Sequence, residues 1–204
     1  GTGSAATVGH GLGAAPEWII VKNRDLSKNW IVYHAHIHSS PAEKSINLNE
    51  TGALYDSAVT FNDTAPTSTV FSVGTGASTN SNGDDHIAYC FAPVAGFSAM
   101  GKFDSTNTTD NAFVYTGFRP RFLIIKKIDT TGGWGIYDAA RNTFNGLDKN
   151  LVANASTVES TLSTAAVDFV SNGFKVRDTL GTDTDLIYIC FAENPFQANG
   201  GLAR

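Results

Sequence analysis

Cysteine, charge and long apolar runs are all scarce in this sequence. Two cysteines among 204 residues do not make a disulfide scaffold, so the fold must depend on an apolar core. Charged residues make up only 16% of the chain and the longest basic cluster is Lys126-Lys127, which excludes the concentrated basic face that nucleic-acid binding requires. No apolar run approaches the roughly 20 residues of a membrane-spanning helix, and the small, polar start G-T-G-S-A-A-T is unlike a signal peptide. We therefore expect neither nucleic acid nor a membrane as a partner.

What the sequence has in quantity is apolar residues suited to strands. Hydrophobic residues form 42% of the chain, which is typical of a folded protein and not of a disordered one. Short runs of β-branched and aromatic residues, such as N-W-I-V-Y and T-V-F-S-V, alternate with turn sequences such as S-N-G and T-T-G-G. The continuous runs W-I-I-V and L-I-I predict strands that are covered on both faces. These patterns predict an all-β protein with β-sandwich or barrel-like domains.

The chain contains an internal repeat. Pro16–Lys22 (P-E-W-I-I-V-K) matches Pro120–Lys126 (P-R-F-L-I-I-K) at an offset of 104 residues (16 to 120). Asp85–Ala92 (D-H-I-A-Y-C-F-A) matches Asp185–Ala192 (D-L-I-Y-I-C-F-A) at an offset of 100 residues (85 to 185). Because this period is too long for a solenoid repeat, we expect two homologous tandem units, with the first over residues 1–100 and the second over residues 101–204.

The first unit is expected to be incomplete at its start. In the second unit, F-V-Y-T-G-F-R-P follows a polar loop at residues 104–111, and a strand-like G-K-F precedes that loop. In the first unit, residues 2–6 occupy the position of the loop, and no strand-like segment precedes them in the sequence. We therefore expect the chain to begin partway through a unit of a larger parent protein.

Three histidines stand at alternate positions in Y-H-A-H-I-H, residues 33–38. In an extended strand, His34, His36 and His38 would share one face, and imidazole is a common zinc and copper ligand. The second unit has Asp138, Ala140 and Asn142 at the corresponding positions. A metal needed to fold the unit should recur in both copies, so we favour a half-buried strand with its polar face in water. An adventitious metal site is the first alternative and catalytic zinc the last, because zinc catalysis also needs an acid/base group and a shaped pocket.

Two kinds of polar position recur in both units. Cys90 and Cys190 are flanked by apolar and aromatic residues and are predicted to be buried free thiols; a disulfide would need α-carbons within about 7 Å. The acidic sequences are Asp84-Asp85 in the first unit and Asp183-Thr184-Asp185 in the second. Carboxylates of this kind bind calcium in some loops, but they lack EF-hand spacing and we expect turns.

Aromatic residues offer the remaining candidates for a binding site. Trp30 and Tyr33 recur as Trp134 and Tyr137, and residues that both copies share are predicted to belong to the core. Tyr55 and Tyr115 occur in one copy each and are the candidates for contact with a glycan. The sequence has no nucleophile elbow, P-loop, dinucleotide fingerprint or paired-carboxylate pattern, so we expect neither enzymatic activity nor a cofactor.

A series of motifs runs through both units. The first unit contains G-L-G-x-x-P-x-W-I-I-V-K, W-x-V-Y-H, L-N-E-T-G and I-A-Y-C-F-A; the second contains W-x-I-Y-D-x-x-R-N, F-V-S-N-G-F-K-V and I-C-F-A-E-N-P-F. This series resembles an uncharacterised repeat module of virion proteins from marine tailed bacteriophages, which are tail-fibre-like or structural proteins. The resemblance covers nearly the whole chain and implies no catalytic residues.

The resemblance implies a virion structural protein that is assembled in the host cytoplasm and acts in the extracellular particle. The leading expectation is a tail-fibre or receptor-binding segment, with other virion subunits and a host surface glycan or protein as partners. The alternatives are a capsid or tail decoration protein and, less favoured, a glycan-acting enzyme, which would need two carboxylates roughly 5–10 Å apart in one cleft. We also expect a homo-oligomer, as a trimer or a repeated array, because many weak contacts become strong when they are presented together.

Overall fold

The computed structural model describes residues 1–178 and 184–195, which lie almost entirely in strands, turns and loops. The helices within these ranges are the short segments η1 (Pro41–Glu43), α1 (Ala58–Phe61) and α2 (Ala77–Asn80). The all-β prediction is confirmed, and the sheets pack in sandwich-like layers. In the described part of the chain, no helix is long and apolar enough to cross a membrane.

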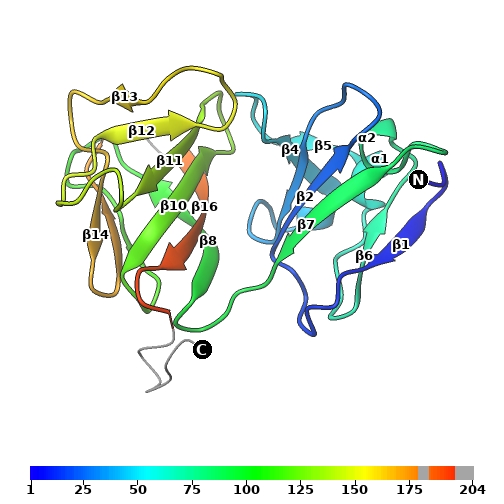
Figure 1. Ribbon diagram of the computed structural model, residues 1–204, viewed down its shortest axis with the longest axis horizontal. Coiled ribbons are helices and arrows are strands. Elements are labelled where there is room, and N and C mark those ends of the chain that lie inside the picture. Colours follow the sequence, from blue (N-terminus) through cyan, green and yellow to red (C-terminus); the bar gives the residue numbers. More distant parts are fainter. Residues whose placement is uncertain (179–183, 196–204) are drawn as a thin grey trace. The chain divides into compact units, whose positions relative to one another are not determined.

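The first compact unit, Gly1–Ala92, is called unit 1 here and contains two sheets (Figure 1). Its strands are β1 (Ala6–Gly9), β2 (Trp18–Asn23), β3 (Ile31–His34), β4 (Lys44–Asn47), β5 (Tyr55–Asp56), β6 (Val70–Val73) and β7 (His86–Phe91). The larger sheet has the order β5-β4-β3-β2-β7, and the smaller pairs β1 with β6. The core between them includes Ile19, Val21, Tyr33, Phe61 and Phe71. Trp18 and Ile19 are adjacent and both buried, so β2 is covered on both faces, as its continuous apolar run predicts.

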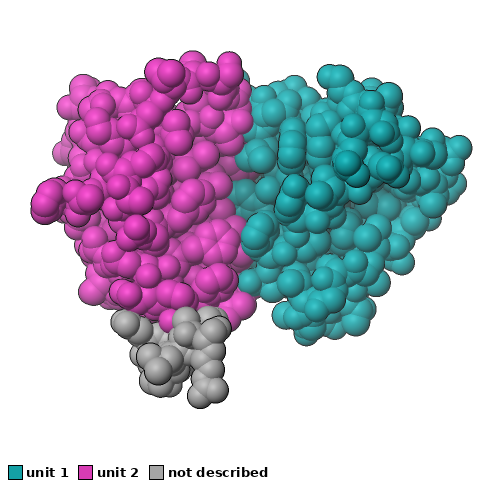
Figure 2. Space-filling view, in the orientation of Figure 1, with its two compact units in different colours: residues 1–92 teal, residues 93–204 magenta. Residues whose placement is uncertain are grey.

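The second compact unit, Pro93–Arg204, is called unit 2 (Figure 2). Its strands are β8 (Ser98–Ser105), β9 (Phe113–Tyr115), β10 (Pro120–Lys127), β11 (Trp134–Asp138), β12 (Lys149–Val152), β13 (Ser160–Thr161), β14 (Val167–Val170), β15 (Gly173–Val176) and β16 (Thr184–Ala192). The larger sheet has the order β13-β12-β11-β10-β16-β8, and the smaller has the order β14-β15-β9. The core cluster includes Leu123, Tyr137, Phe169, Phe174 and Tyr188.

The division between the units differs from the expected boundary at residue 100. The structure places it after Ala92, and residue 100 falls inside β8. The reason is strand pairing: β8 is bonded to β16 from Ser98 opposite Phe191 to Ser105 opposite Thr184. The strand that follows the last repeated motif of the first unit therefore belongs to the second unit.

The two larger sheets share one order of strands. The series β5-β4-β3-β2-β7 in unit 1 corresponds to β13-β12-β11-β10-β16 in unit 2, and β2, β3 and β7 fall on β10, β11 and β16 at the offsets of the sequence repeat. The smaller sheets agree as well, because β1 pairs with β6 as β9 pairs with β15. This shared order supports the inferred duplication. The difference is β8, which lies beyond β16 at the edge of the unit 2 sheet.

The four aromatic residues that recur in both units occupy two kinds of environment. Tyr33 and Tyr137 belong to the core clusters of their units, as predicted, whereas Trp134 is buried on the opposite face of its sheet, where it pairs with Lys126. Trp30 is half-buried and stacks on Tyr89 of β7, with ring centroids 6.5 Å apart and planes inclined by 19°. Trp30 therefore covers the outer face of the unit 1 sheet and does not lie in the core between the sheets.

Candidate functional site

The histidine segment does not form the row that its spacing predicts. Strand β3 ends at His34. Ala35 N still donates to Glu17 O (2.8 Å) beyond β2, and the chain then turns with a hydrogen bond from Ile37 N to His34 O (3.1 Å). The turn buries Ile37, and removal of its side chain from water stabilises this conformation. The prediction of three histidines along one strand face is therefore wrong.

His34 is also not in water. Its side chain is 0% exposed, and its ring meets Trp18 edge-on at 5.4 Å. His34 Nδ1 accepts a hydrogen bond from the backbone N–H of His36 (3.1 Å). His36 and His38 are exposed, and Nε2 of His36 lies 3.1 Å from Glu17 Oε2. Among the residues that the structure describes, no three His, Cys, Asp or Glu side chains are grouped as metal ligands.

The acidic positions of unit 1 serve turn structure. Asp84 Oδ2 accepts a hydrogen bond from Asn23 Nδ2 (2.8 Å), and this bond, followed by one from Ser81, lowers the pKa of the Asp84 carboxyl. The backbone N–H of Asp85 donates to Asp25 Oδ2 (2.6 Å). These contacts are those of a turn that leads into β7, as the sequence predicts.

In unit 2, the recurring polar positions are tied into strand β16. Asp185 pairs with Lys102 (2.5 Å), whereas Asp183 lies outside the described residues. Cys90 and Cys190 are free thiols, and burial raises the pKa of Cys190 to about 12. A thiol with so high a pKa stays protonated and unreactive, so Cys190 fits the predicted apolar role.

The two candidate tyrosines differ in exposure. Tyr55 is half-buried, its hydroxyl donates to Asn47 Oδ1 (2.9 Å), and burial raises its pKa. Tyr55 therefore holds β5 against β4 and is less exposed than a residue in contact with a glycan is expected to be. Tyr115 is 68% exposed on β9 and remains available to a ligand.

Phe113 joins Tyr115 on the outer face of β9. Phe113 is 50% exposed, while Val114 between them is buried, because alternate residues of a strand face opposite sides. On the neighbouring strand β15, Lys175 lies opposite Phe113 and Gly173 opposite Tyr115. The sequence F-V-Y carries the alternation that identifies Phe113, which was not predicted.

A charged pair borders this aromatic face. Lys175 Nζ lies 2.7 Å from Asp110 Oδ1 and also donates to the backbone carbonyl of Asn111. The hydrogen bond from Lys175, with the charge of its ammonium group, lowers the pKa of Asp110. Two exposed rings beside an ion pair provide both apolar area and hydrogen-bonding groups, which is the combination that a sugar ring with its hydroxyl groups requires.

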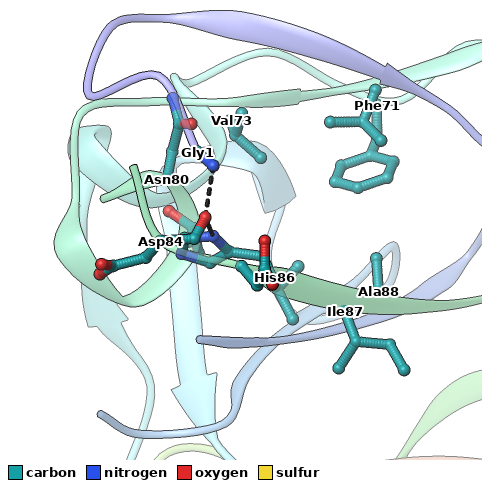
Figure 3. Close-up of a pocket in the computed structure, with 12 residues that line it drawn as sticks. Gly1, Phe71, Val73, Asn80, Asp84, His86, Ile87 and Ala88 are labelled. Atoms are coloured by element: carbon teal, nitrogen blue, oxygen red, sulfur yellow. Dashed lines mark hydrogen bonds between the residues drawn. The ribbon is translucent and has the colours of Figure 1, made fainter. Parts of the chain in front are cut away.

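Unit 1 contains a cavity of about 330 Å³ between its two sheets (Figure 3). Its lining residues include Val8 of β1, Val21 of β2, Phe71 and Val73 of β6, and His86 and Ala88 of β7. Polar groups stand beside this apolar lining: the amino group of Gly1 donates to Asp84 O (2.5 Å). Nε2 of His86 is buried and has no hydrogen-bond partner within the described ranges. Strands β1, β6 and β7 thus line an open pocket with both apolar and polar residues, and the unsatisfied Nε2 of His86 lies beside it.

Comparison with known proteins places the chain in a family. Residues 1–195 match the family described as a domain of unknown function, DUF7483. No curated protein and no solved structure matches the chain. Since the match covers far more than half of the sequence, the chain belongs to the DUF7483 family.

Proposed function

We propose that this protein is a structural component of a bacteriophage virion and acts as a tail-fibre or receptor-binding segment. The motif series that resembles a virion repeat module supports this role. The aromatic face of β9, formed by Phe113 and Tyr115, carries the binding part of the proposal. Its ligand is a glycan of the host surface, and the role is binding without catalysis.

The proposed contact is weak in one copy and strong in many. Two exposed rings on an open face bury little of a ligand, so a single site gives low affinity. A homo-oligomer presents several such faces together, and later contacts then become effectively intramolecular. This argument favours a trimer or a repeated array of the parent protein.

Binding of residues 1–204 to polysaccharide from host cells tests the aromatic face. Tyr115→Ala and Phe113→Ala are expected to lower binding about tenfold each, because each removes apolar contact area of one ring. Phe144→Ala is the matched control, since Phe144 is also exposed but lies outside β9. Equal binding by all variants would contradict the proposed face.

Electron microscopy of virions with an antibody against this chain tests the virion role. Label on the distal tail supports a receptor-binding segment. Label over the capsid or the tail tube replaces that role with decoration by contact with other virion subunits. Particles without label reject both assignments.

A further inference from the structure

The aromatic face of β9 continues onto β15, where a lysine stands beside it. Lys175 of β15 lies directly opposite Phe113, and Gly173 lies opposite Tyr115. Both rings are well exposed, so each can receive a flat apolar surface from solvent. One end of the face therefore joins a ring to an ammonium group, and the other end joins a ring to bare backbone.

Unit 1 has none of these three side chains at the corresponding positions. Each smaller sheet pairs a buried phenylalanine with a valine: Phe71 with Val8 in unit 1, and Phe174 with Val114 in unit 2. In this register, the positions of the two rings and the lysine are occupied in unit 1 by Thr7, Gly9 and Ser72. Since the strands pair in the same way without them, the two rings and the lysine are not needed to form the sheet. Their occurrence together in one unit fits contact with a ligand.

Lys175 retains a donor that its own unit does not use. An ammonium group carries three N–H donors. Lys175 Nζ lies 2.7 Å from Asp110 Oδ1 and also donates to the backbone carbonyl of Asn111, and it has no third partner among the described residues. The two contacts hold the ammonium group in place beside the rings, and one N–H remains for a ligand.

Asp110 supplies an acceptor next to that donor. Its side chain is 88% exposed in the loop between β8 and β9, and its contact with Lys175 uses Oδ1. In the described part of the chain, no group is bonded to Oδ2. The other carboxylate of this face differs, because Asp168 accepts from Gly146 N (2.9 Å) and pairs with Arg177 (2.6 Å). Asp110 and Lys175 thus offer one acceptor and one donor side by side.

We propose that this face binds a neutral sugar ring that has two adjacent hydroxyl groups beside an apolar face of C–H groups, as galactose has. One hydroxyl donates to Asp110 Oδ2 and the other accepts from Lys175 Nζ, because a hydroxyl group can do either. The C–H face packs on Phe113, and a neighbouring ring of the glycan reaches Tyr115 roughly 7 Å further along β9. The inference rests on the proposed glycan contact and names the class of glycan that this contact takes.

The exposed carboxylate also selects against acidic sugars. Asp110 places a negative charge at the rim of the face, and a like charge on a ligand is repelled. The charge of Lys175 does not attract an acid strongly, because it is already paired with Asp110. An acidic sugar would have to break this pair before it could bind the lysine. A neutral ring binds both groups while the pair stays intact.

Methyl β-galactoside and its 3,4-dideoxy derivative test the proposal by NMR titration of residues 1–204. Wild type is expected to bind the galactoside about tenfold more tightly, because the derivative lacks hydrogen bonds to charged groups. In Asp110→Ala this difference should largely disappear, since the acceptor is gone and Lys175 loses its counter-ion. Asp185→Ala is the matched control, because Asp185 also pairs with a lysine (2.5 Å) but lies on the larger sheet of unit 2.

The other outcomes separate this inference from the glycan contact itself. Equal binding of the two sugars to wild type, with Tyr115→Ala still weakening both, overturns the inference and leaves the glycan contact in place. Methyl galacturonate that binds as tightly as the galactoside also overturns it. If neither sugar shifts the resonances of Phe113 and Tyr115, the glycan contact is overturned as well. The two sugars are compared on wild-type protein, so the test stays decisive even if Asp110→Ala does not fold.

Discussion

Units 1 and 2 have the same order of strands but finish their sheets differently. In unit 2, β8 covers the edge of β16 and supplies Phe103 to the core. In unit 1, β7 is the last strand, and a cavity lies where the unit 2 core has aromatic rings. The comparison teaches that one strand completes both the hydrogen bonding of a sheet edge and the packing behind it.

The units also differ in how they treat one polar position. His34 ends β3 as a buried imidazole against Trp18, whereas the corresponding Asp138 ends β11 in an ion pair with Arg141. Burial opposes ionisation of Asp138, but hydrogen bonds from Arg141 outweigh it and lower the pKa of the carboxyl. Arg141 also pairs with Glu159 (3.1 Å), so its guanidinium contacts two carboxylates of unit 2. Equivalent positions at the ends of β3 and β11 are thus occupied by a buried imidazole and by a carboxylate in a network of charged side chains.

The largest effect is expected from matched truncations of Phe174 and Phe71. Phe174→Ala should lower the free energy of unfolding by about 3–5 kcal/mol, because the ring is fully buried among aromatic neighbours. Phe71→Ala should cost less, since Phe71 already borders a cavity and has fewer atoms to lose contact with. Urea denaturation, with amide hydrogen exchange as the probe of unfolding in each unit, measures the cost of both substitutions. Equal costs would show that the cavity does not loosen unit 1.

The next effect concerns Lys126, whose side chain is 1% exposed. Burial lowers its pKa from 10.5 to about 8, with a smaller contribution from Lys127. Below pH 8 both states are protonated, and the folded state carries the part of the cost of burial that contacts such as the hydrogen bond from Lys126 Nζ to Lys127 O (2.6 Å) do not offset. Between about pH 8 and 10.5 the unfolded state binds more protons, so this lysine makes stability rise with pH.

Lys126→Met should therefore raise the free energy of unfolding at pH 7 by roughly 2 kcal/mol and remove that rise. Lys22→Met is the control, because Lys22 occupies the corresponding position of unit 1, is only half-buried, and donates to Leu26 O (3.1 Å). Chemical denaturation at several pH values measures the difference. A wild-type stability that falls between pH 8 and 10 by more than that of Lys126→Met would contradict this account.

An effect of similar size is expected at the contact between β8 and β16. Gly101→Ala should cost about 1–3 kcal/mol, since its Cβ would stand 2.8 Å from the Tyr188 ring. In a Tyr188→Ala background, the same change should be nearly neutral, because the ring is absent. A double-mutant cycle measures the coupling, and additive costs would argue against direct contact as the cause.

The smallest effect is expected from the histidines outside the core. His36→Ala should change the free energy of unfolding by no more than about 0.5 kcal/mol, because its side chain is exposed. Addition of EDTA should leave Tm unchanged in both wild type and variant. His34→Ala is the contrasting variant and should destabilise unit 1, since it leaves a void against Trp18. A large fall of Tm with EDTA would restore the metal-site interpretation.

The fold class could be predicted from the sequence because strand patterns are local. The runs W-I-I-V-K and F-L-I-I-K-K became β2 and β10, and the repeat indicated which strands correspond. The unit boundary could not be predicted, because it depends on β8 pairing with a strand that follows much later in the chain. The histidines could not be placed for a different reason: alternation predicts a strand, but a hydrogen bond from Ile37 N to His34 O closes a turn directly after β3.

The candidate sites depended even more on tertiary structure. Tyr115 was chosen as a candidate because the first unit has no counterpart, and the structure shows that it is exposed. Tyr55 was chosen for the same kind of reason, but its hydroxyl is bonded to Asn47. The cavity beside Ala88 has no local signal in the sequence. It becomes visible only when Ala88 is compared with Tyr188 in a known register.

The pairing of β8 with β16 also has a consequence for biosynthesis. Strand β8 covers residues 98–105 and its partner residues 184–192, so the ribosome releases β8 long before β16 exists. During that interval, strands β1 to β7 have all emerged, and β8 follows β7 in the chain with only a short connection. The nascent chain thus holds β8 before the strand with which it pairs has been made. The time taken to translate residues 106–183 therefore sets how long β8 stays without its partner, and we expect the long sequence separation to make this pairing slow.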